Sequence, residues 1–453
     1  MFEGKITNTS HVPRKDAFLD SGDMVKNPVQ VFEKYRAELG PTFTFHFGGA
    51  RKTLVSADPI FIQHVLKDNQ RNYEKSDIQV KRMAEFQEKG LLNSHGDFWL
   101  RQRRLLSQGF SRNHLPNLLP LQAKVLDEFM HSFDTEVKLG ATDIYHQMVK
   151  LTLRVVGKSL FGNEMKDEEL EQIGDTISKI QAFIVRQIVQ PYKIPWFRIS
   201  GQTAHFQKMR FEADLIIHDY VYKRKREGSV QGDLLQLMLT TPYKDTGELM
   251  SDDQVMIEVL QLLVAGNETS SNTLAWTFYT LAKHPEYVTE IRAEINATFD
   301  NNEVDFNGLH QLHCSIRVLN EVMRLYPAFW MIDRIALQDD EACGVHIPAG
   351  ITVVPYIYGV HHNADLWDNP MRFDPGRFDR EQGKSRHPFA HVPFGGGPRV
   401  CIGQNMALMQ ILLIMVSIIR KYDFKLTPDQ TVSMNPMMIL RPSGAIMIDF
   451  TPI

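Results

Sequence analysis

The sequence predicts a mainly α-helical protein with small β-sheets. Over long stretches of the 453-residue chain, apolar residues recur with the 3.6-residue period of a helix. The longest of these amphipathic runs span residues 115–133, 143–161, 167–190 and 202–226. Strand-like alternation of aromatic and β-branched residues is confined to 42–55 and to a short stretch at 445–450. Helices therefore dominate the predicted fold.

Composition is that of an ordinary soluble protein with a large core, at 43% hydrophobic and 23% charged residues. A net charge of −4 predicts no general attraction to nucleic acid. Three cysteines, Cys314, Cys343 and Cys401, make no disulfide framework and favour a reduced, cytoplasmic setting. The first residues carry no apolar segment, so we expect no signal peptide and no transmembrane anchor.

The N-terminal third mixes short elements with polar stretches. Residues 1–27 are polar, and we expect a surface arm there. Asn27-Pro28 and Asp58-Pro59 are capping pairs that each open a helix. Between these helices, the alternating residues predict a hairpin that turns at Gly48-Gly49. Residues 74–95 have no clear period and are expected to be irregular.

Three arginines and a tryptophan follow on the next predicted helix. Trp99 and Arg103 are four residues apart and therefore share a face. Such a pair is usually a packing contact with a small cation–π contribution. Arg101 and Arg104 lie on other faces and are expected to be solvated.

A long helix is predicted from a capping box at Ser251–Gln254 to about residue 283. Its middle contains Gly266, Glu268 and Thr269. Glycine costs about 1 kcal/mol in a helix interior relative to alanine, and a threonine hydroxyl can bond back to a carbonyl and bend the helix. Two interpretations remain open: close packing against another helix, or a groove at a functional bend.

Cys401 lies just before an amphipathic run at 404–420, after several glycines and Arg399. A helix N-terminus, free amides and a nearby positive charge all favour a thiolate, which either attacks a substrate or binds a metal. A cysteine hydrolase is disfavoured because no paired base accompanies Cys401 in any recognised pattern. The alternative is a glycine turn before a helix with a buried cysteine.

The pattern Phe-x-x-Gly-x-Arg-x-Cys-x-Gly is filled at every fixed position by Phe394, Gly397, Arg399, Cys401 and Gly403. It resembles the haem-binding loop of the cytochrome P450 monooxygenases, in their soluble bacterial form, and places that loop at 391–404. The resemblance implies that Cys401 is the axial thiolate of haem b iron. Arg399 would pair with a haem propionate, and Phe394 would shield the sulfur.

Four further motifs occur in the family's order along nearly the whole chain. By this resemblance Trp99, Arg103 and Arg334 reach haem propionates, and His391 either does so or faces solvent. Glu268 and Thr269 resemble the acid–alcohol pair that relays protons during oxygen activation. Buried structural charges are implied for Glu321, Arg324 and Arg377.

The resemblance also implies the cytochrome P450 fold over 1–453 as a single domain. Haem would be held between the long central helix and the cysteine loop, with β-rich parts at 28–60 and 435–453. The chain is expected to be a monomer.

The implied activity is insertion of one oxygen atom of O2 into a C–H bond of a lipophilic substrate, such as a fatty acid or a terpenoid- or steroid-like molecule. Electrons would come from NAD(P)H through a separate ferredoxin or flavodoxin and its reductase, with Arg101, Arg104 and Arg112 as candidate docking residues. The alternative is a non-catalytic haem-thiolate sensor or carrier, which would have no use for the Glu268–Thr269 relay.

Segments that line the substrate pocket in the family correspond here to mainly apolar residues, of which as many as half could belong to the core. The candidates are Leu262, Ala265, Phe329, Trp330, Ile332, Met438 and Ile439. Any cation that anchors a substrate carboxylate would come from Arg51, Lys52, Lys81 or Arg82. The loop at 191–197 is either a lid or a surface connection, and His361-His362 are expected to be loop residues without a metal.

Overall fold

The structure is a computed structural model, and it describes residues 6–47, 51–228, 232–300, 303–379, 381 and 383–453. The chain divides into two compact units, each assembled from separated segments. The first unit contains Met1–Ser76, Ile316–Cys401 and Ser433–Ser443. The second contains Asp77–Ser315, Ile402–Val432 and Gly444–Ile453.

A six-stranded sheet forms the first unit, in the order β1-β2-β3-β9-β6-β4. The predicted hairpin is its centre: β2 and β3 pair antiparallel, with Thr42 opposite Ser56. Its turn at Gly48-Gly49 lies outside the described residues. The strands are β1 (Ser10–His11), β2 (Thr42–Phe47), β3 (Arg51–Ser56), β9 (Thr352–Pro355), β6 (Arg334–Ala336) and β4 (Tyr73–Glu74).

Helix α3 (Pro28–Leu39) packs its aromatic face into this unit's core. The Asn27 side chain caps it by accepting the Gln30 N–H at 3.2 Å, as the sequence predicts. The Phe32 ring lies edge-on to Phe45 at 5.7 Å and to Tyr356 at 5.3 Å between centroids. Such offset pairs add stability beyond the apolar area that they bury.

The expected N-terminal surface arm is more ordered than its polar composition indicated. Residues 14–26 form α1 (Arg14–Leu19) and α2 (Ser21–Lys26). The Val12 N–H donates to the Thr44 carbonyl at 2.9 Å, and the Val12 and Ala17 side chains are buried. Two apolar residues and strand pairing are enough to hold this segment on the sheet.

The remaining elements of the first unit are short. Helix α4 (Pro59–Gln63) continues into a π-helical turn, η1 (His64–Asp68). The others are η2 (Gln70–Asn72), β7 (Asp340–Ala342), β8 (Val345–Ile347), α17 (Ile357–His361), η5 (Pro375–Phe378), η6 (Pro388–Ala390), η7 (Gly397–Arg399), β11 (Met434–Pro436) and β12 (Leu440–Pro442). Helix α16 (His313–Leu325) begins in the second unit and ends in the first.

His361 is the last residue of α17 and His362 is its C-cap, and both are buried, which corrects the expectation that they are loop residues. Both follow the hydrophobic residues of α17, and the ring Nε2 of His361 accepts the Val392 N–H at 2.9 Å. Their role here is to pack in the core and to form hydrogen bonds with backbone groups. Among the described residues, no group of histidine, cysteine and acidic side chains could hold a metal ion.

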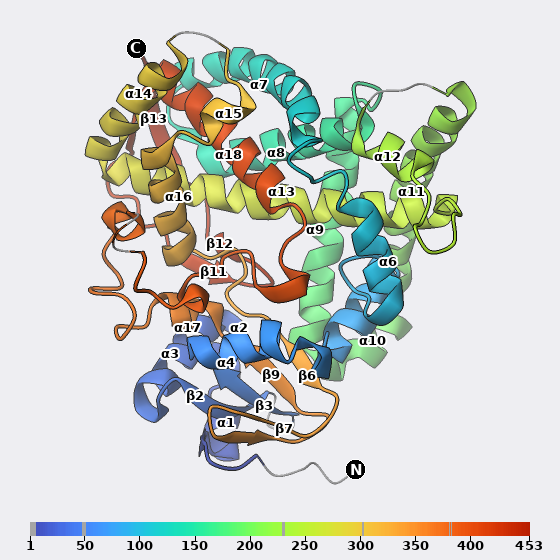
Figure 1. The fold of residues 1–453 in the computed structure, drawn as a ribbon, viewed down its shortest axis with the longest axis vertical. Coiled ribbons are helices and arrows are strands. Elements are labelled where there is room, and N and C mark those ends of the chain that lie inside the picture. The colour runs from blue at the N-terminus through green and yellow to red at the C-terminus, as the bar shows by residue number, and fades with distance from the viewer. Residues whose placement is uncertain (1–5, 48–50, 229–231, 301–302, 380, 382) are drawn as a thin grey trace. The chain divides into compact units, whose positions relative to one another are not determined.

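The second unit is built around α13 (Asp252–Lys283), with α8 (Ile144–Phe161) packed along it (Figure 1). The long predicted helices are confirmed, with ends that shift by a few residues. They are α7 (Leu115–Lys138), α9 (Asp167–Val189), α11 (Gln202–Glu227) and α18 (Gln404–Lys421). Their amphipathic periods were long enough to identify them without tertiary information.

Half of the predicted capping box at the start of α13 forms. The Ser251 hydroxyl accepts the Gln254 N–H at 3.3 Å. The Gln254 side chain does not return to the cap, because its amide donates to Glu258 at 2.9 Å and to the Lys89 carbonyl at 3.2 Å. A partner distant in sequence has displaced the local bond.

Residues 74–95 are partly helical, contrary to the irregular structure expected. They contain a π-helical turn, η3 (Ile78–Met83), and α5 (Ala84–Gln87). A π-helical turn does not follow the 3.6-residue period, so the periodicity of the sequence could not indicate it. The loop at 191–197 likewise contains η4 (Pro191–Lys193) and the start of α10 (Ile194–Ile199).

A three-stranded sheet, β10 (Tyr422–Leu426), β13 (Met447–Pro452) and β5 (Thr142–Asp143), completes the second unit. The other helices of this unit are α6 (Gly96–Leu106), α12 (Leu234–Thr240), α14 (Pro285–Phe299) and α15 (Phe306–Leu309). Among the helices that the structure describes, none combines the length and the apolar character needed to cross a bilayer.

Candidate functional site

The cysteine loop is held in a strained backbone path that requires glycine. Gly397 has φ +67°, and a Cβ there would lie 1.9 Å from the Leu66 carbonyl oxygen of η1. Such an approach excludes every other residue. The loop closes through the Cys401 N–H, which donates to the Phe394 carbonyl at 3.0 Å.

Cys401 is exposed in the structure and lies three residues before α18 begins. The other two cysteines differ from it in setting, since Cys314 is buried and burial raises the pKa of Cys343. Of the three, only Cys401 therefore combines an accessible sulfur with a glycine-shaped loop and a helix N-terminus.

Three cations gather beside this loop, one of which the sequence analysis missed. Arg334 is buried at 7% exposure, and its Nη1 donates to the Asp333 carbonyl at 2.7 Å. Burial, together with Arg334 and Arg399, lowers the pKa of Lys75 to about 7. The Asp333 carboxylate offsets part of the charge of these three cations, and the cluster keeps an excess of positive charge. No motif identified Lys75, because a lone lysine in a segment without a period resembles any surface lysine.

His391 lies among aromatic rings and not in solvent. Its Nε2–H donates to the Asn320 carbonyl at 3.2 Å, and its ring is 4.7 Å from that of Phe378. Burial lowers the pKa of His391 to about 3, so the ring is neutral. One ring nitrogen is thus committed to the scaffold.

The structure brings Glu321, Arg324 and Arg377 together in one buried cluster. Arg324 donates two bonds of 2.7 Å to the Glu321 carboxylate, and both side chains are fully buried. Arg377 Nε lies 3.4 Å from the same carboxylate. Arg324 also donates to the carbonyls of His361 and Pro370, which ties α16 to the segment before the cysteine loop.

The middle of α13 carries the second set of candidate residues. Residues 264–269 are all partly exposed, whereas the neighbouring turns of this helix are buried. The Thr269 hydroxyl donates to the Ala265 carbonyl at 2.7 Å, as expected for a threonine that loosens a helix. The two interpretations of Gly266, close helix packing and a groove at a bend, are compatible. A Cβ at this position would lie 3.0 Å from the Val156 side chain of α8, so the glycine also permits close packing.

Asn267 and Thr152 form a polar contact that sequence reasoning did not find. The Thr152 hydroxyl lies 2.7 Å from Asn267 Oδ1 and 3.2 Å from the Asn267 carbonyl. It therefore attaches α8 to α13 at the position between Gly266 and Glu268. Only tertiary packing brings these two residues together, so neither period nor motif could predict the pair.

Trp99 and Arg103 lie on α6, where both are partly exposed. On another face of this helix, Arg101 is not simply solvated: it pairs with Asp245 at 2.9 Å, and its guanidinium lies 5.1 Å from the centre of the Tyr243 ring. Arg104 is exposed, as expected.

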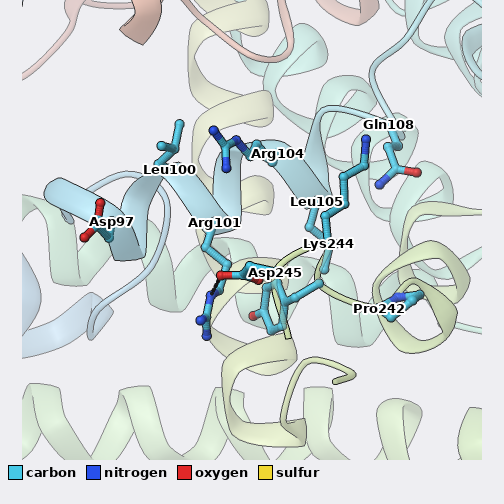
Figure 2. Close-up of a pocket in the computed structure, with 10 residues that line it drawn as sticks. Asp97, Leu100, Arg101, Arg104, Leu105, Gln108, Pro242, Lys244 and Asp245 are labelled. Atoms are coloured by element: carbon cyan, nitrogen blue, oxygen red, sulfur yellow. Dashed lines mark hydrogen bonds and ion pairs between the residues drawn. The ribbon is translucent and has the colours of Figure 1, made fainter. Parts of the chain in front are cut away.

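Figure 2 shows a pocket of about 310 Å³ between this face of α6 and residues 242–245. Leucines 100 and 105 of α6 lie beside it, together with the Arg101–Asp245 pair. The Arg104 and Lys244 side chains contribute positive charge at its edge.

The candidate substrate-lining residues separate into two groups. Phe329, Ile332 and Met438 keep some exposure, as does Ala265, whereas Leu262 of α13 is buried. Trp330 instead belongs to the aromatic core of the first unit, where its Nε1–H donates to the Met437 carbonyl at 2.9 Å, and Ile439 is also buried. We remove Trp330 from the pocket because packing and this hydrogen bond account for it fully.

Cation candidates for a substrate carboxylate can be placed only in part. The side chains of Arg51 and Arg82 lie outside the described part of the chain. Lys81 is exposed and pairs with Asp77 at 3.1 Å on the same helical turn. The charge of Lys81 is therefore already paired with a carboxylate of the protein, which makes this lysine a weaker candidate for a substrate carboxylate.

The residues present fit a haem group. A haem carries two propionates, and the cluster of Lys75, Arg334 and Arg399 offers a net positive charge where two carboxylates would be stabilised. Cys401 offers an accessible sulfur in the same unit. Haem iron takes a thiolate as an axial ligand, and amides near the sulfur tune its electron donation.

Comparisons with known proteins agree with this chemistry. Cyclooctat-9-en-7-ol 5-monooxygenase of Streptomyces melanosporofaciens is 27% identical, over 85% of this chain and 83% of its own. Putative cytochrome P450 132 of Mycobacterium tuberculosis is 29% identical, over 89% and 88%. Cytochrome P450 734A5 of Oryza sativa is 27% identical, over 96% and 83%. Bacterial and plant relatives both appear, so the similarity does not restrict the source.

A solved structure has the same fold. The crystal structure of the cytochrome P450DA heme domain superposes with a TM-score of 0.86, at 21% identity, over 98% of this chain and 96% of that one. The model of the cytochrome P450 family matches residues 17–450. With a cysteine loop, a cationic cluster and a family match over residues 17–450, this chain belongs to the cytochrome P450 family and is a haem monooxygenase.

Proposed function

We propose that this enzyme hydroxylates an unactivated C–H bond of a lipophilic molecule, with haem b as its cofactor and Cys401 as the axial ligand. The observation that carries the proposal is the pairing of an exposed Cys401 in a glycine-shaped loop with the Lys75–Arg334–Arg399 cluster in the same unit. A haem that is held without covalent bonds needs a thiolate for its iron and cationic partners for its two propionates. The chain contains no Cys-x-x-Cys-His motif for covalent attachment.

When bound, the haem supplies the redox chemistry that activates O2. The protein's own residues bind, orient and protonate. Arg399, Arg334 and Lys75 would hold the propionates, and Trp99 and Arg103 of α6 are further candidates for this task. His391 supports the loop through Asn320 and Phe378. Phe394 shields the sulfur of Cys401.

Proton delivery is assigned to Glu268 and Thr269. Both belong to the partly exposed stretch of α13, where a carboxyl group and a hydroxyl can meet water. The Thr269 hydroxyl proton bonds the Ala265 carbonyl, so the oxygen of this hydroxyl remains free to accept a proton-carrying partner. An alternative, non-catalytic role as a haem sensor or carrier would leave this pair without a purpose.

The substrate class follows from the chemistry of the candidate lining. Ala265, Phe329, Ile332 and Met438 offer apolar surface, and methionine adapts to ligands of different shape. We infer a fatty acid or a terpenoid- or steroid-like substrate. The printed name of the Streptomyces relative describes that protein as a monooxygenase of an unsaturated alcohol, cyclooctat-9-en-7-ol, which supports a lipophilic substrate.

Electrons would come from NAD(P)H through a separate acidic ferredoxin or a flavodoxin. The candidate docking face is the exposed side of α6, where Arg104 and Lys244 frame the pocket of Figure 2, with Arg112 as a further candidate. Arg101 contributes less, because Asp245 already neutralises it.

Thiolate ligation tests the proposal directly. The reduced protein with carbon monoxide should show the red-shifted Soret band of a thiolate-ligated haem, and Cys401→Ser should lose it. Cys314→Ser and Cys343→Ser are the matched controls and should keep the band. If Cys401→Ser keeps the band, another residue is the ligand. Turnover of a lipophilic compound with O2 and reductant then separates an enzyme from a sensor.

A further inference from the structure

Residues 86–93, which we call the clamp segment, are fastened to α13 by buried polar side chains. Glu258 Oε2 accepts the Leu91 N–H at 3.0 Å, and Gln261 Oε1 accepts the Leu92 N–H at 2.8 Å. The Gln261 amide also donates to the Gln87 carbonyl and to Asn93 Oδ1, both at 3.2 Å. Two adjacent turns of α13 therefore satisfy the backbone of a segment distant in sequence.

The contact is close as well as polar. A Cβ on Gly90 would lie 2.6 Å from Gln261 Oε1, so a side chain there would displace the amide that holds Leu92. Glu258 and Gln261 have 0% and 1% of their surface exposed. The clamp segment thus seals this part of α13 from solvent.

The other end of the clamp segment is attached to α11. Arg210 Nε donates to the Phe86 carbonyl at 2.9 Å, and the Phe86 ring meets Phe183 of α9 at 5.8 Å between centroids. The segment therefore connects α11 and α9 to α13.

The position of the clamp on α13 matters for the pocket. Buried residues of this helix continue up to Leu263, and the partly exposed stretch that holds Ala265 and Thr269 begins at residue 264. The clamp thus ends where the exposed stretch begins. Lifting it would lengthen that stretch toward the start of the helix by about two turns.

We propose that Glu258 and Gln261 are specificity-determining residues, which hold the clamp segment on α13 and so limit the length of the ligand that the accessible stretch of this helix accepts. The inference rests on the proposed function for its substrate class, but not for the existence of the clamp. Both residues act through the segment, and neither is a catalytic residue.

Glu258 also makes the clamp sensitive to pH. No ion pair joins Glu258 to any residue that the structure describes, and burial raises its pKa to about 7. Charged or titratable groups on the elements packed around it are Glu88 and Lys89 of the clamp, Arg210 of α11, and Tyr243, whose pKa Glu258 helps to raise. Glu88 and Arg210 lie 3.8 Å apart, so their charges offset each other.

The direction of the pH effect follows from the raised pKa. With the clamp open, Glu258 meets water and returns toward its ordinary pKa; with the clamp closed, it prefers to be protonated. Closing is therefore most favoured at low pH, and it weakens as pH rises toward 7, by at most about tenfold for each pH unit. Above pH 7 the dependence levels off.

Hydrogen–deuterium exchange on the purified holoenzyme tests the clamp itself. Between pH 5 and 7, protection of the Leu91 and Leu92 amides, corrected for intrinsic exchange, should fall in the wild type. In Glu258→Gln it should be independent of pH, and in Gln261→Ala it should be low throughout. The matched control is Glu294→Gln, another carboxylate that accepts backbone N–H groups, at Cys314 and Ser315. Equal pH dependence in wild type and Glu258→Gln would overturn the clamp.

A ligand series tests the effect on specificity without relying on the natural substrate. 1-Alkylimidazoles bind haem iron through the imidazole, and each methylene that finds apolar space should tighten binding about fourfold. In the wild type this gain should stop at a certain chain length, and in Gln261→Ala it should continue to longer chains. An identical limit in both proteins overturns the specificity role. Failure of every lipid to shift the Soret band overturns the proposed substrate class, whereas the exchange and imidazole results still decide the clamp.

Discussion

Lys75 illustrates how surroundings change the chemistry of a single side chain. An ordinary lysine keeps its charge far above neutral pH, but burial and the neighbouring arginines lower the pKa of Lys75 to about 7. A bound propionate favours the protonated form and would raise this pKa again. Below pH 7 its contribution to haem affinity is fully present, and it declines as pH rises from about 7 through the raised pKa.

We therefore expect Lys75→Met to release haem about tenfold faster at pH 6, because the variant loses one charge-assisted hydrogen bond to a propionate. Above pH 7, haem loss should accelerate with pH in the wild type and less so in the variant. Transfer of haem to a scavenging protein, followed by absorbance, measures both. Lys67→Met, at an exposed lysine of η1, should behave like the wild type. Equal haem loss from all three proteins would remove Lys75 from the propionate site.

Thr269→Ala removes the hydroxyl proposed for the proton relay. The variant should bind haem and substrate normally but consume NAD(P)H while releasing hydrogen peroxide, because proton delivery is impaired. Product formed per reductant consumed is the measurement. Thr273→Ala is the control, since its hydroxyl donates to the Thr269 carbonyl one turn along and lies on a buried part of α13. Unchanged coupling in Thr269→Ala would exclude the relay.

At the scale of elements, periodicity was a good guide for long helices and a poor one for short or irregular turns. Helices α7, α8, α9 and α13 repeat their apolar face often enough to be recognised. Local pattern could not reveal α1 or the π-helical turn η3, because tertiary contacts and non-standard periods determine them. Tertiary contact also draws the Gln254 side chain away from the capping box, because its amide donates to the Lys89 carbonyl, which is distant in sequence.

The buried network on α16 should be costly to break. Glu321→Gln removes the carboxylate that Arg324 and Arg377 share at full burial, and we expect a loss of about 3–5 kcal/mol in unfolding free energy. Chemical denaturation measures it. Glu381→Gln is the matched control, because Glu381 and Lys384 are also three residues apart but exposed. A Glu321→Gln protein as stable as the control would show that the network contributes little.

At the scale of the whole molecule, each unit gathers segments far apart in the sequence. The candidate site was predictable where a motif fixed the spacing, as at Phe394, Arg399 and Cys401 or at Glu268 and Thr269. It was not predictable where packing alone supplied the partner, as for Lys75 and for Thr152 with Asn267. Trp330 shows the opposite error, since apolar character alone does not distinguish a pocket from a core.

The prediction for the molecule as a whole concerns the rate at which a partner protein reduces it. The net charge is −4, yet the face around Arg104 and Lys244 is locally positive. Reduction by an acidic ferredoxin should slow with ionic strength, and Arg104→Glu should lower the rate and flatten that dependence. Stopped-flow measurement under carbon monoxide reports it. Lys384→Glu, at an exposed lysine of the first unit, serves as the control. Identical salt dependence in Arg104→Glu and the wild type would exclude this docking face.

The close contact between Gly397 and the Leu66 carbonyl has a consequence for how the protein is made. Leu66 and Gly397 lie far apart in the sequence, so the cysteine loop can take its folded shape only after the whole segment between them has been synthesised. Haem binding through Cys401 would therefore have to follow synthesis of this loop, and a chain cut short before Gly397 would lack both the loop and the sulfur.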